Sequence, residues 1–169
     1  MTDEPGPGLH AALEPLAAFV GTWRGLGVGG YPSIEPFRYE QELVLGHDGR
    51  PFLSYSSRSW LLGEDGRRTR PGASETGWWR PGPEPRSLEV LLAHHTGIVE
   101  VYVGEVAFTR VDLATDVVAR TATAKSVTAV KRLYGMVEGD LAYAVDMAAE
   151  GHPLQSHLSA RLVREQLDS

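Results

Sequence analysis

Imidazole is the functional group that stands out in this chain, which has six histidines: His10, His47, His94, His95, His152 and His157. There is no cysteine, so thiolate nucleophiles, thiolate metal sites and disulfides are excluded. The sequence also lacks a Gly-x-Ser-x-Gly nucleophile turn and a His-Glu-x-x-His zinc pattern. Nothing therefore indicates hydrolytic or zinc chemistry, and the question becomes which fold positions the histidines.

Residues 1–20 are expected to form a short helical lead-in. Leu9, Leu13 and Leu16 follow a helical spacing, which is interrupted at Pro15. We expect one or two helical turns that cover an end of the fold.

From Gly21 onward, apolar residues recur at every second position, which is typical of half-buried strands. Turn signals such as Asp48-Gly49 separate these segments. After a first strand that begins at Gly21, we expect strands over 37–45, 52–60, 76–80, 87–93, 98–108, 125–137, 141–147 and 152–164.

Many short strands at regular spacing predict an all-β fold in a single domain, residues 1–169. We expect an antiparallel up-and-down β-barrel of about ten strands, similar to lipocalins and fatty-acid-binding proteins, because closure leaves no exposed edge. A two-sheet sandwich is the alternative. The interior of such a barrel either fills with side chains or holds one small ligand.

The charge of the chain argues against nucleic acid as a partner. Sixteen basic and twenty-two acidic residues give a formal net charge of −6. Arg67, Arg68 and Arg70 do cluster, but we interpret 63–72 as a solvated turn. The start of the chain, Met1–Pro5, is acidic, and no apolar run approaches the ~20 residues needed to span a bilayer. We expect a cytoplasmic protein with no membrane partner.

The first strand carries an unusual run of glycines, Gly21-Thr22-Trp23-Arg24-Gly25-Leu26-Gly27. Glycines at alternate positions clear one face of a strand. Such a strand either lets something bulky approach its backbone or simply bends within the core.

This run leads into Tyr31-Pro32-Ser33, and together they resemble the first strand of the nitrobindins. These are small heme-binding β-barrels, also called ferric nitrobindin-like proteins or peroxynitrite isomerases. The resemblance extends over most of the chain, through Tyr31–Glu40, Pro51–Tyr55, Ser74–Gly77, Leu91–His94, Ala122–Ala129, and Asp140–Tyr143 with Met147.

The segment Pro153–Arg164 resembles the closing strand of this family, whose His-Leu-x-Ala-x-Leu pattern supplies the proximal heme ligand. The resemblance implies that His157 is the axial ligand of the iron. Strand alternation alone gives a different answer, because it places Leu158 and Leu162 on one face and His157 on the other, as for an exposed histidine. Each of the other histidines is interpreted as a surface or turn residue.

The resemblance also implies that Ser33 lies beside the heme and that Lys125 pairs with a propionate. The alternatives are an ordinary turn hydroxyl for Ser33 and a solvated strand charge for Lys125. In the glycine-rich strand, Gly21, Trp23, Gly25 and Gly27 are expected to contact the cofactor, with Gly25 and Gly27 lining the cavity.

One position departs from the family. Many members have a histidine before Ser-Glu-Thr-Gly, near the open face of the heme, where this chain has Ala73. Functions that need an imidazole at that position are therefore in question.

By resemblance, the function is isomerisation of peroxynitrite to nitrate at a ferric heme b, with nitric oxide as a further ligand and a homodimer as the assembly. The alternatives are a non-catalytic carrier of a fatty acid or other apolar ligand, and a sensor of heme or nitric oxide.

Overall fold

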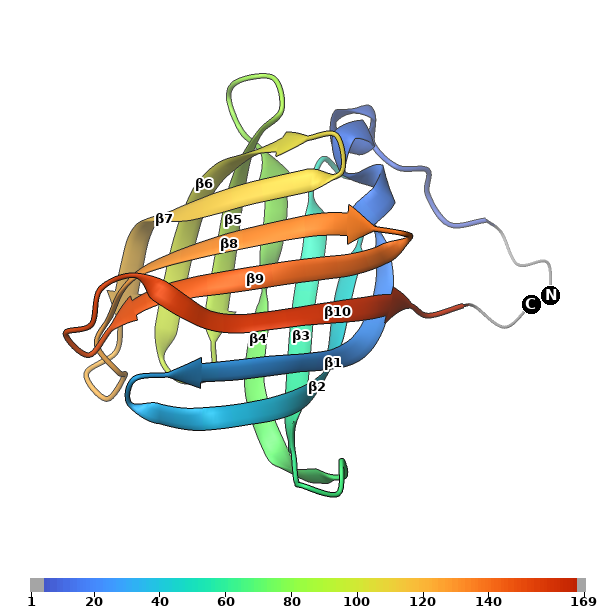
Figure 1. Ribbon diagram of the computed structural model, residues 1–169. Coiled ribbons are helices and arrows are strands. Elements are labelled where there is room, and N and C mark those ends of the chain that lie inside the picture. The colour runs from blue at the N-terminus through green and yellow to red at the C-terminus, as the bar shows by residue number, and fades with distance from the viewer. Residues whose placement is uncertain (1–4, 167–169) are drawn as a thin grey trace.

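The computed structural model describes residues 5–166 and shows a closed, ten-stranded antiparallel barrel (Figure 1). Each strand pairs with its neighbours in sequence, and β1 pairs with β10 to close the barrel. The elements are η1 (Ala11–Phe19), β1 (Gly21–Tyr31), β2 (Ile34–Gly46), β3 (Leu53–Leu62), β4 (Arg68–Pro81), β5 (Ser87–His94), β6 (Ile98–Ala107), β7 (Arg110–Arg120), β8 (Val127–Val137), β9 (Asp140–Ala149) and β10 (Gln155–Arg164). The predicted fold is confirmed; residues 1–4 and 167–169 lie outside the description.

Alternation of apolar and polar residues decides which side chains fill the barrel. In β2, Tyr39, Gln41, Leu43 and Leu45 are buried, whereas the residues between them are exposed or only partly buried. This is the face that the sequence pattern predicts.

Strands β7 and β4 differ most from the sequence prediction. Strand β7 was not expected, because the turn before it, at Phe108, has no glycine or proline and instead places a bulky, exposed residue at a positive φ of 55°. Strand β4 begins earlier than expected, so Arg68 and Arg70 belong to a strand and not to a turn. Arg68 is held there by Glu40, which accepts hydrogen bonds of 2.8 Å from its guanidinium.

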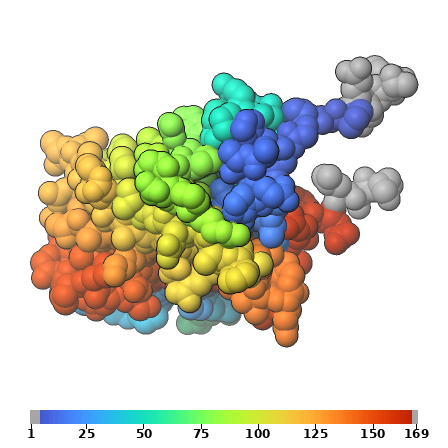
Figure 2. Space-filling view, turned by 90° about the horizontal axis from the view of Figure 1, so that it is seen from above, coloured from blue at the N-terminus to red at the C-terminus, as the bar shows by residue number. Residues whose placement is uncertain are grey.

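The lead-in forms a 3₁₀ helix, η1, that closes one end of the barrel (Figure 1). Leu13, Leu16 and Phe19 are fully buried there. The indole Nε1 of Trp23 donates a hydrogen bond of 2.9 Å to the carbonyl oxygen of Phe19, which ties the helix to β1. In Figure 2 the lead-in lies against the turn between β2 and β3, where Pro7 contacts the backbone at Gly49. Within residues 5–166, no helix is long and apolar enough to cross a membrane.

The opposite end of the barrel is where the site forms. Because the strands alternate in direction, the connections β1–β2, β3–β4, β5–β6, β7–β8 and β9–β10 all meet at the end away from η1. In Figure 1 the β1–β2, β7–β8 and β9–β10 turns lie together at the left, away from the helix, and the β3–β4 turn projects at the bottom. The side chains at this end surround a cavity instead of a packed core.

Candidate functional site

A cavity of about 480 Å³ opens at this end of the barrel. Side chains from most of the strands contribute to its wall, and most of its lining is apolar. The lining includes Ser33, Ala73, His94, Lys125, Arg132 and His157.

His157 reaches the cavity because β10 contains a β-bulge. Ser156 lies opposite Asp146 and Leu158 lies opposite Val145 in β9, so His157 is an extra residue between two regular pairs. An extra residue interrupts the strict alternation of faces. His157 and Leu158 therefore both line the cavity, although they are neighbours in sequence. The alternation that placed His157 on the outer face is wrong at this position.

The ring of His157 is fixed in one orientation, and its neutral form in one tautomer. Its Nδ1 lies 3.0 Å from the carbonyl oxygen of Gly30. A carbonyl can only accept, so Nδ1 carries the proton and Nε2 keeps its lone pair. Burial lowers the pKa of His157, which favours the neutral imidazole. Tyr31 packs against the ring edge-to-face, with centroids 5.7 Å apart.

This arrangement is the one required of an axial ligand. A histidine that donates its second ring N–H to a carbonyl presents the other nitrogen, unprotonated, to a metal. The carbonyl of Gly30 is available because Gly30 has no ladder partner in β2 or β10.

Ser33 and Lys125 are brought to the same cavity. Ser33 lies in the β1–β2 turn, and Lys125 lies in the β7–β8 connection just before β8, outside the strand expected there. Within the described residues, the Lys125 ammonium has no ion pair. It is therefore available to an anionic group at the mouth of the cavity.

The glycine run Gly21–Gly27 of β1 does not line the cavity, although Tyr31 at the end of the same strand does. A Cβ on Gly27 would meet the ring of Tyr39, and one on Gly25 would lie 3.0 Å from the Cα of Leu162. The expectation that Gly25 and Gly27 line the cavity is wrong, because the ring of Tyr39 and the backbone of β10 occupy that space. The glycines allow this close approach to the face of β1.

Gly21 and Trp23 lie at the closed end of the barrel. Trp23 is fully buried against η1, and the guanidinium of Arg164 lies over Gly21. Neither residue is part of the cavity wall. Of the residues expected at the site, the structure brings together His157, Lys125 and Ser33.

The cavity wall also contains a buried charged cluster that was not predicted from the sequence. Arg132 lies at its centre, with its Nη2 2.7 Å from Oε2 of Glu75 and 3.7 Å from Oε1 of Glu100. Its Nε donates a hydrogen bond of 2.9 Å to the hydroxyl of Tyr102, which donates one of 2.8 Å to Oε2 of Glu100. The Oε2 of Glu75 is close to the guanidinium but is not aligned for a hydrogen bond. The signal in the sequence was a charge at a core-facing position, as in Val130-x-Arg132-x-Tyr134.

Glu100 and Arg132 are both charged in this cluster. Burial alone would raise the pKa of the Glu100 carboxyl, but its hydrogen bond from His94 and the charge of Arg132 lower that pKa below its usual value. Burial alone would lower the pKa of Arg132, but the facing carboxylate of Glu75 raises it well above the usual value. The cavity wall therefore carries a fixed guanidinium between two carboxylates.

Behind this cluster the cavity continues into a chamber of about 150 Å³. A chain of hydrogen bonds crosses it: the hydroxyls of Tyr39 and Tyr143 lie 2.6 Å apart, and that of Tyr143 donates to Gln41 at 2.5 Å. The amide of Gln41 donates to Ser57 at 2.7 Å. Tyr39, Tyr143, Gln41 and Ser57 thus satisfy one another.

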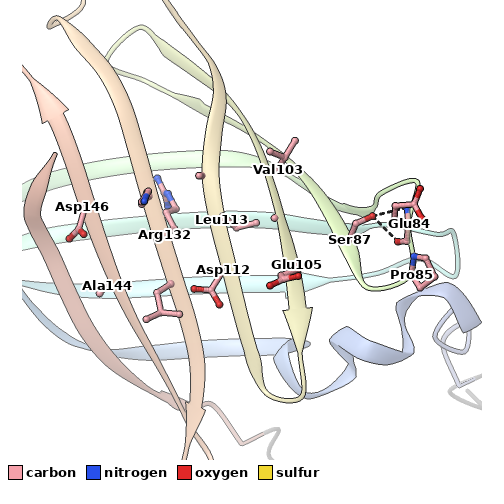
Figure 3. Close-up of a pocket in the computed structure, with 14 residues that line it drawn as sticks. Glu84, Pro85, Ser87, Val103, Glu105, Asp112, Leu113, Arg132, Ala144 and Asp146 are labelled. Atoms are coloured by element: carbon pink, nitrogen blue, oxygen red, sulfur yellow. Dashed lines mark hydrogen bonds between the residues drawn. The ribbon is translucent and has the colours of Figure 1, made fainter.

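A larger hollow of about 760 Å³ lies on the barrel wall over β6 to β9. Figure 3 shows four carboxylates on its wall: Glu105 and Asp112 lie next to each other on β6 and β7, whereas Glu84 and Asp146 lie far apart on either side of them. Asp112 is already paired with Arg110, whose Nε lies 2.7 Å away. This hollow therefore offers no convergent donor set, and the cavity at the open end remains the candidate site.

A closed barrel with one open cavity and a neutral imidazole aimed into it defines a small-ligand-binding barrel suited to an iron cofactor. A heme b matches the residues present: the cavity has the size typical of cofactor pockets, His157 offers its Nε2, and Lys125 offers a cation for a propionate. The chain belongs to the THAP4-like family of heme-binding β-barrel domains, whose sequence profile matches residues 12–164.

Relatives of known name agree with this assignment. A protein of Salinispora arenicola named peroxynitrite isomerase is 53% identical over 163 residues, covering 94% of this chain and 83% of that protein. A protein of Frankia casuarinae with the same name is 58% identical, covering 92% and 87%. One of Kineococcus radiotolerans, named ferric nitrobindin-like protein, is 53% identical, covering 90% and 92%.

A solved structure has the same fold. The crystal structure of Rv2717c from M. tuberculosis aligns with a TM-score of 0.83 at 38% sequence identity. The alignment covers 94% of this chain and 100% of that one.

Proposed function

We propose that this protein binds heme b and isomerises peroxynitrite to nitrate. The observation that carries the proposal is the orientation of His157, which a bulge turns into the cavity and which Gly30 holds with Nε2 unprotonated. The names of relatives that are 52–58% identical over most of the chain supply the reaction.

The cofactor and the protein side chains have different roles in the proposed reaction. When bound, the heme supplies a ferric iron that acts as a Lewis acid on the peroxo oxygen. His157 holds the cofactor from one side, and Lys125 neutralises a propionate at the mouth. Apolar side chains such as Ile34, Val127 and Met147 limit the access of water to the reacting groups.

Nitric oxide is proposed as a second ligand of the same iron. It is a small neutral molecule, and the open part of the cavity beside Ala73 leaves room for a diatomic ligand. Its binding to the ferrous and ferric forms can be followed by the change in the absorbance of the heme.

We also propose a homodimer formed through the outer face of β4 to β7. Trp78, Leu91, Val101 and Val117 are consecutive partners across these four strands and form an outward-facing apolar row. Trp78 is 51% exposed, which is unusual for so large an apolar side chain. A second copy would cover this row.

The dimer is tested by measuring molar mass in solution by light scattering. Trp78→Glu should convert the dimer to a monomer, whereas Val28→Glu, at an equally exposed position in β1, should leave it intact. A monomeric wild-type protein at micromolar concentration would contradict the proposal.

The function itself is tested in two steps. Titration of the purified chain with hemin should give a saturable Soret band, and a colourless protein that retains a fatty acid would favour the carrier alternative. Stopped-flow decay of peroxynitrite should then be faster with the ferric protein than with the hemin-free chain, with nitrate as the product. Nitrite in place of nitrate, or no acceleration, would contradict isomerase activity.

A further inference from the structure

His94 lies on the cavity wall that faces His157. Its strand, β5, is five strands away from β10 in either direction around the closed barrel. Both side chains line the same cavity, so they approach it from opposite walls. A ligand between them would have an imidazole on each side.

The imidazole of His94 is fixed by a buried carboxylate. Its Nε2 is hydrogen-bonded to Oε1 of Glu100, a residue that is only 2% exposed and is held in turn by Tyr102. Because Glu100 is charged and can only accept, Nε2 carries a proton. The other ring nitrogen, Nδ1, has no hydrogen-bond partner among residues 5–166.

The wall beside His94 is open. Glu75 lies directly opposite His94 in the β4–β5 ladder, and Ala73 is the next residue of β4 on the same face. A methyl group at position 73 leaves space next to the imidazole. A small ligand can therefore reach His94 without displacing another side chain.

Charges around the cavity make an anion unfavourable there unless a proton accompanies it. Three carboxylates face the cavity, Glu75 from β4, Glu100 from β6 and Glu150 from the β9–β10 turn. Two cations face it, Arg132 from β8 and Lys125 from the β7–β8 connection. The phenols of Tyr31 and Tyr102 and the imidazole of His157 are further titratable groups on this wall and on the one opposite. His94 can correct this excess of negative charge by becoming an imidazolium.

We propose that His94 binds anionic ligands of this cavity by taking up one proton from solvent at Nδ1 and donating it in a hydrogen bond. The Nε2–H bond to Glu100 is unchanged, and no bond of the ligand is made or broken in this step. The inference rests on the proposed function, since it assigns to His94 the recognition of an anionic oxidant.

The experiment measures the affinity of the hemin-loaded ferric protein for fluoride, a small anion that accepts hydrogen bonds, between about pH 6 and pH 8.5. Because one proton is bound with each anion, the affinity should fall by up to about tenfold per pH unit as the pH rises. In His94→Gln this dependence should disappear, and the affinity at the acidic end should be lower than in wild type.

Two further variants make the assignment specific. His95→Gln is the matched control, because His95 is adjacent but exposed in the β5–β6 connection, and its curve should match wild type. Glu100→Gln removes the carboxylate that stabilises the imidazolium, so its affinity should begin to fall at a lower pH. Equal melting temperatures of the His94→Gln and His95→Gln variants would separate loss of anion binding from loss of fold.

The outcomes are distinguishable. A wild-type affinity that does not change with pH overturns the inference, as does a slope that persists in His94→Gln, which competition by hydroxide would produce. A chain that takes up no hemin defeats the proposed function, and the hemin titration reveals this before fluoride is added.

Discussion

The Nδ1 of His157 lies 3.0 Å from the carbonyl oxygen of Gly30, and this contact joins the two irregular places of β1 and β10. Strand β1 changes register between Gly29 and Tyr31, and β10 does so between Ser156 and Leu158. In β1 the irregularity leaves the carbonyl group of Gly30 without a ladder partner, and in β10 it turns the side chain of His157 inward. The position of the imidazole therefore depends on both strands.

His157→Ala should fold but lose hemin affinity by at least about tenfold, because it removes the ring nitrogen that the contact with Gly30 leaves unprotonated in the cavity. Absorbance titration with hemin measures the affinity, and circular dichroism checks the fold. His152→Ala is the matched control, since that ring also packs edge-on against Tyr31 at 5.7 Å but does not line the cavity. Unchanged affinity and an unchanged ferric spectrum would show that another residue is the ligand.

Gly27→Val should lower the free energy of unfolding by about 1–3 kcal/mol, because its side chain would collide with the ring of Tyr39. Gly30→Ala is the control, since its Cβ would lie 3.7 Å from the Cα of Pro36, an ordinary contact. Urea unfolding of the hemin-free proteins measures both. A Gly27→Val protein as stable as wild type, but unable to bind hemin, would restore a role for Gly27 in the cavity wall.

Arg132→Met should destabilise the hemin-free barrel by about 3–5 kcal/mol, because it leaves the buried carboxylates of Glu75 and Glu100 without their cation. Arg110→Met removes an exposed ion pair with Asp112 and should cost less than about 1 kcal/mol. Chemical unfolding at neutral pH compares the two. Equal losses would mean that the buried cluster contributes no more than a surface pair.

Glu100 should make the stability of the protein sensitive to acid. The pKa of its carboxyl is below the usual value of 4.5 in the folded protein, so the unfolded chain binds the proton more readily. The stabilisation is present above about pH 4.5 and is lost as the pH falls through the folded-state pKa. Glu100→Gln should be less stable at neutral pH but lose less stability on acidification, as urea unfolding between about pH 7 and pH 3 can show. Parallel profiles for the two proteins would contradict this.

Alternation in the sequence was sufficient to predict a closed barrel and the inward face of β2, because β2 follows its pleat without interruption from Tyr39 to Leu45. Alternation failed at His157, because one extra residue in β10 reverses the face to which the following side chains point. No residue type in the sequence marks this bulge. The resemblance to nitrobindins predicted His157 as the heme ligand, whereas strand alternation placed it on the outer face. Lys125 and Ser33 were also found through that resemblance, since both lie in connections that have no periodicity.

The Arg132 cluster could have been found from the sequence alone. Glu100 stands between Ile98 and Tyr102 at core-facing positions, so a charge falls where the pattern requires an apolar side chain. The glycines of β1 were misassigned for a different reason. A glycine leaves space beside the backbone, but the sequence does not show which neighbouring group fills that space. At Gly27 it is the ring of Tyr39.

The bulge at His157 makes the inward position of this imidazole depend on how many residues β10 contains, and not only on their types. His157 is the single residue between Ser156 and Leu158, so a β10 with an unbroken ladder to β9 would place a histidine on a face set by simple alternation. The length of one strand is therefore as much a determinant of this cavity as the identity of its residues.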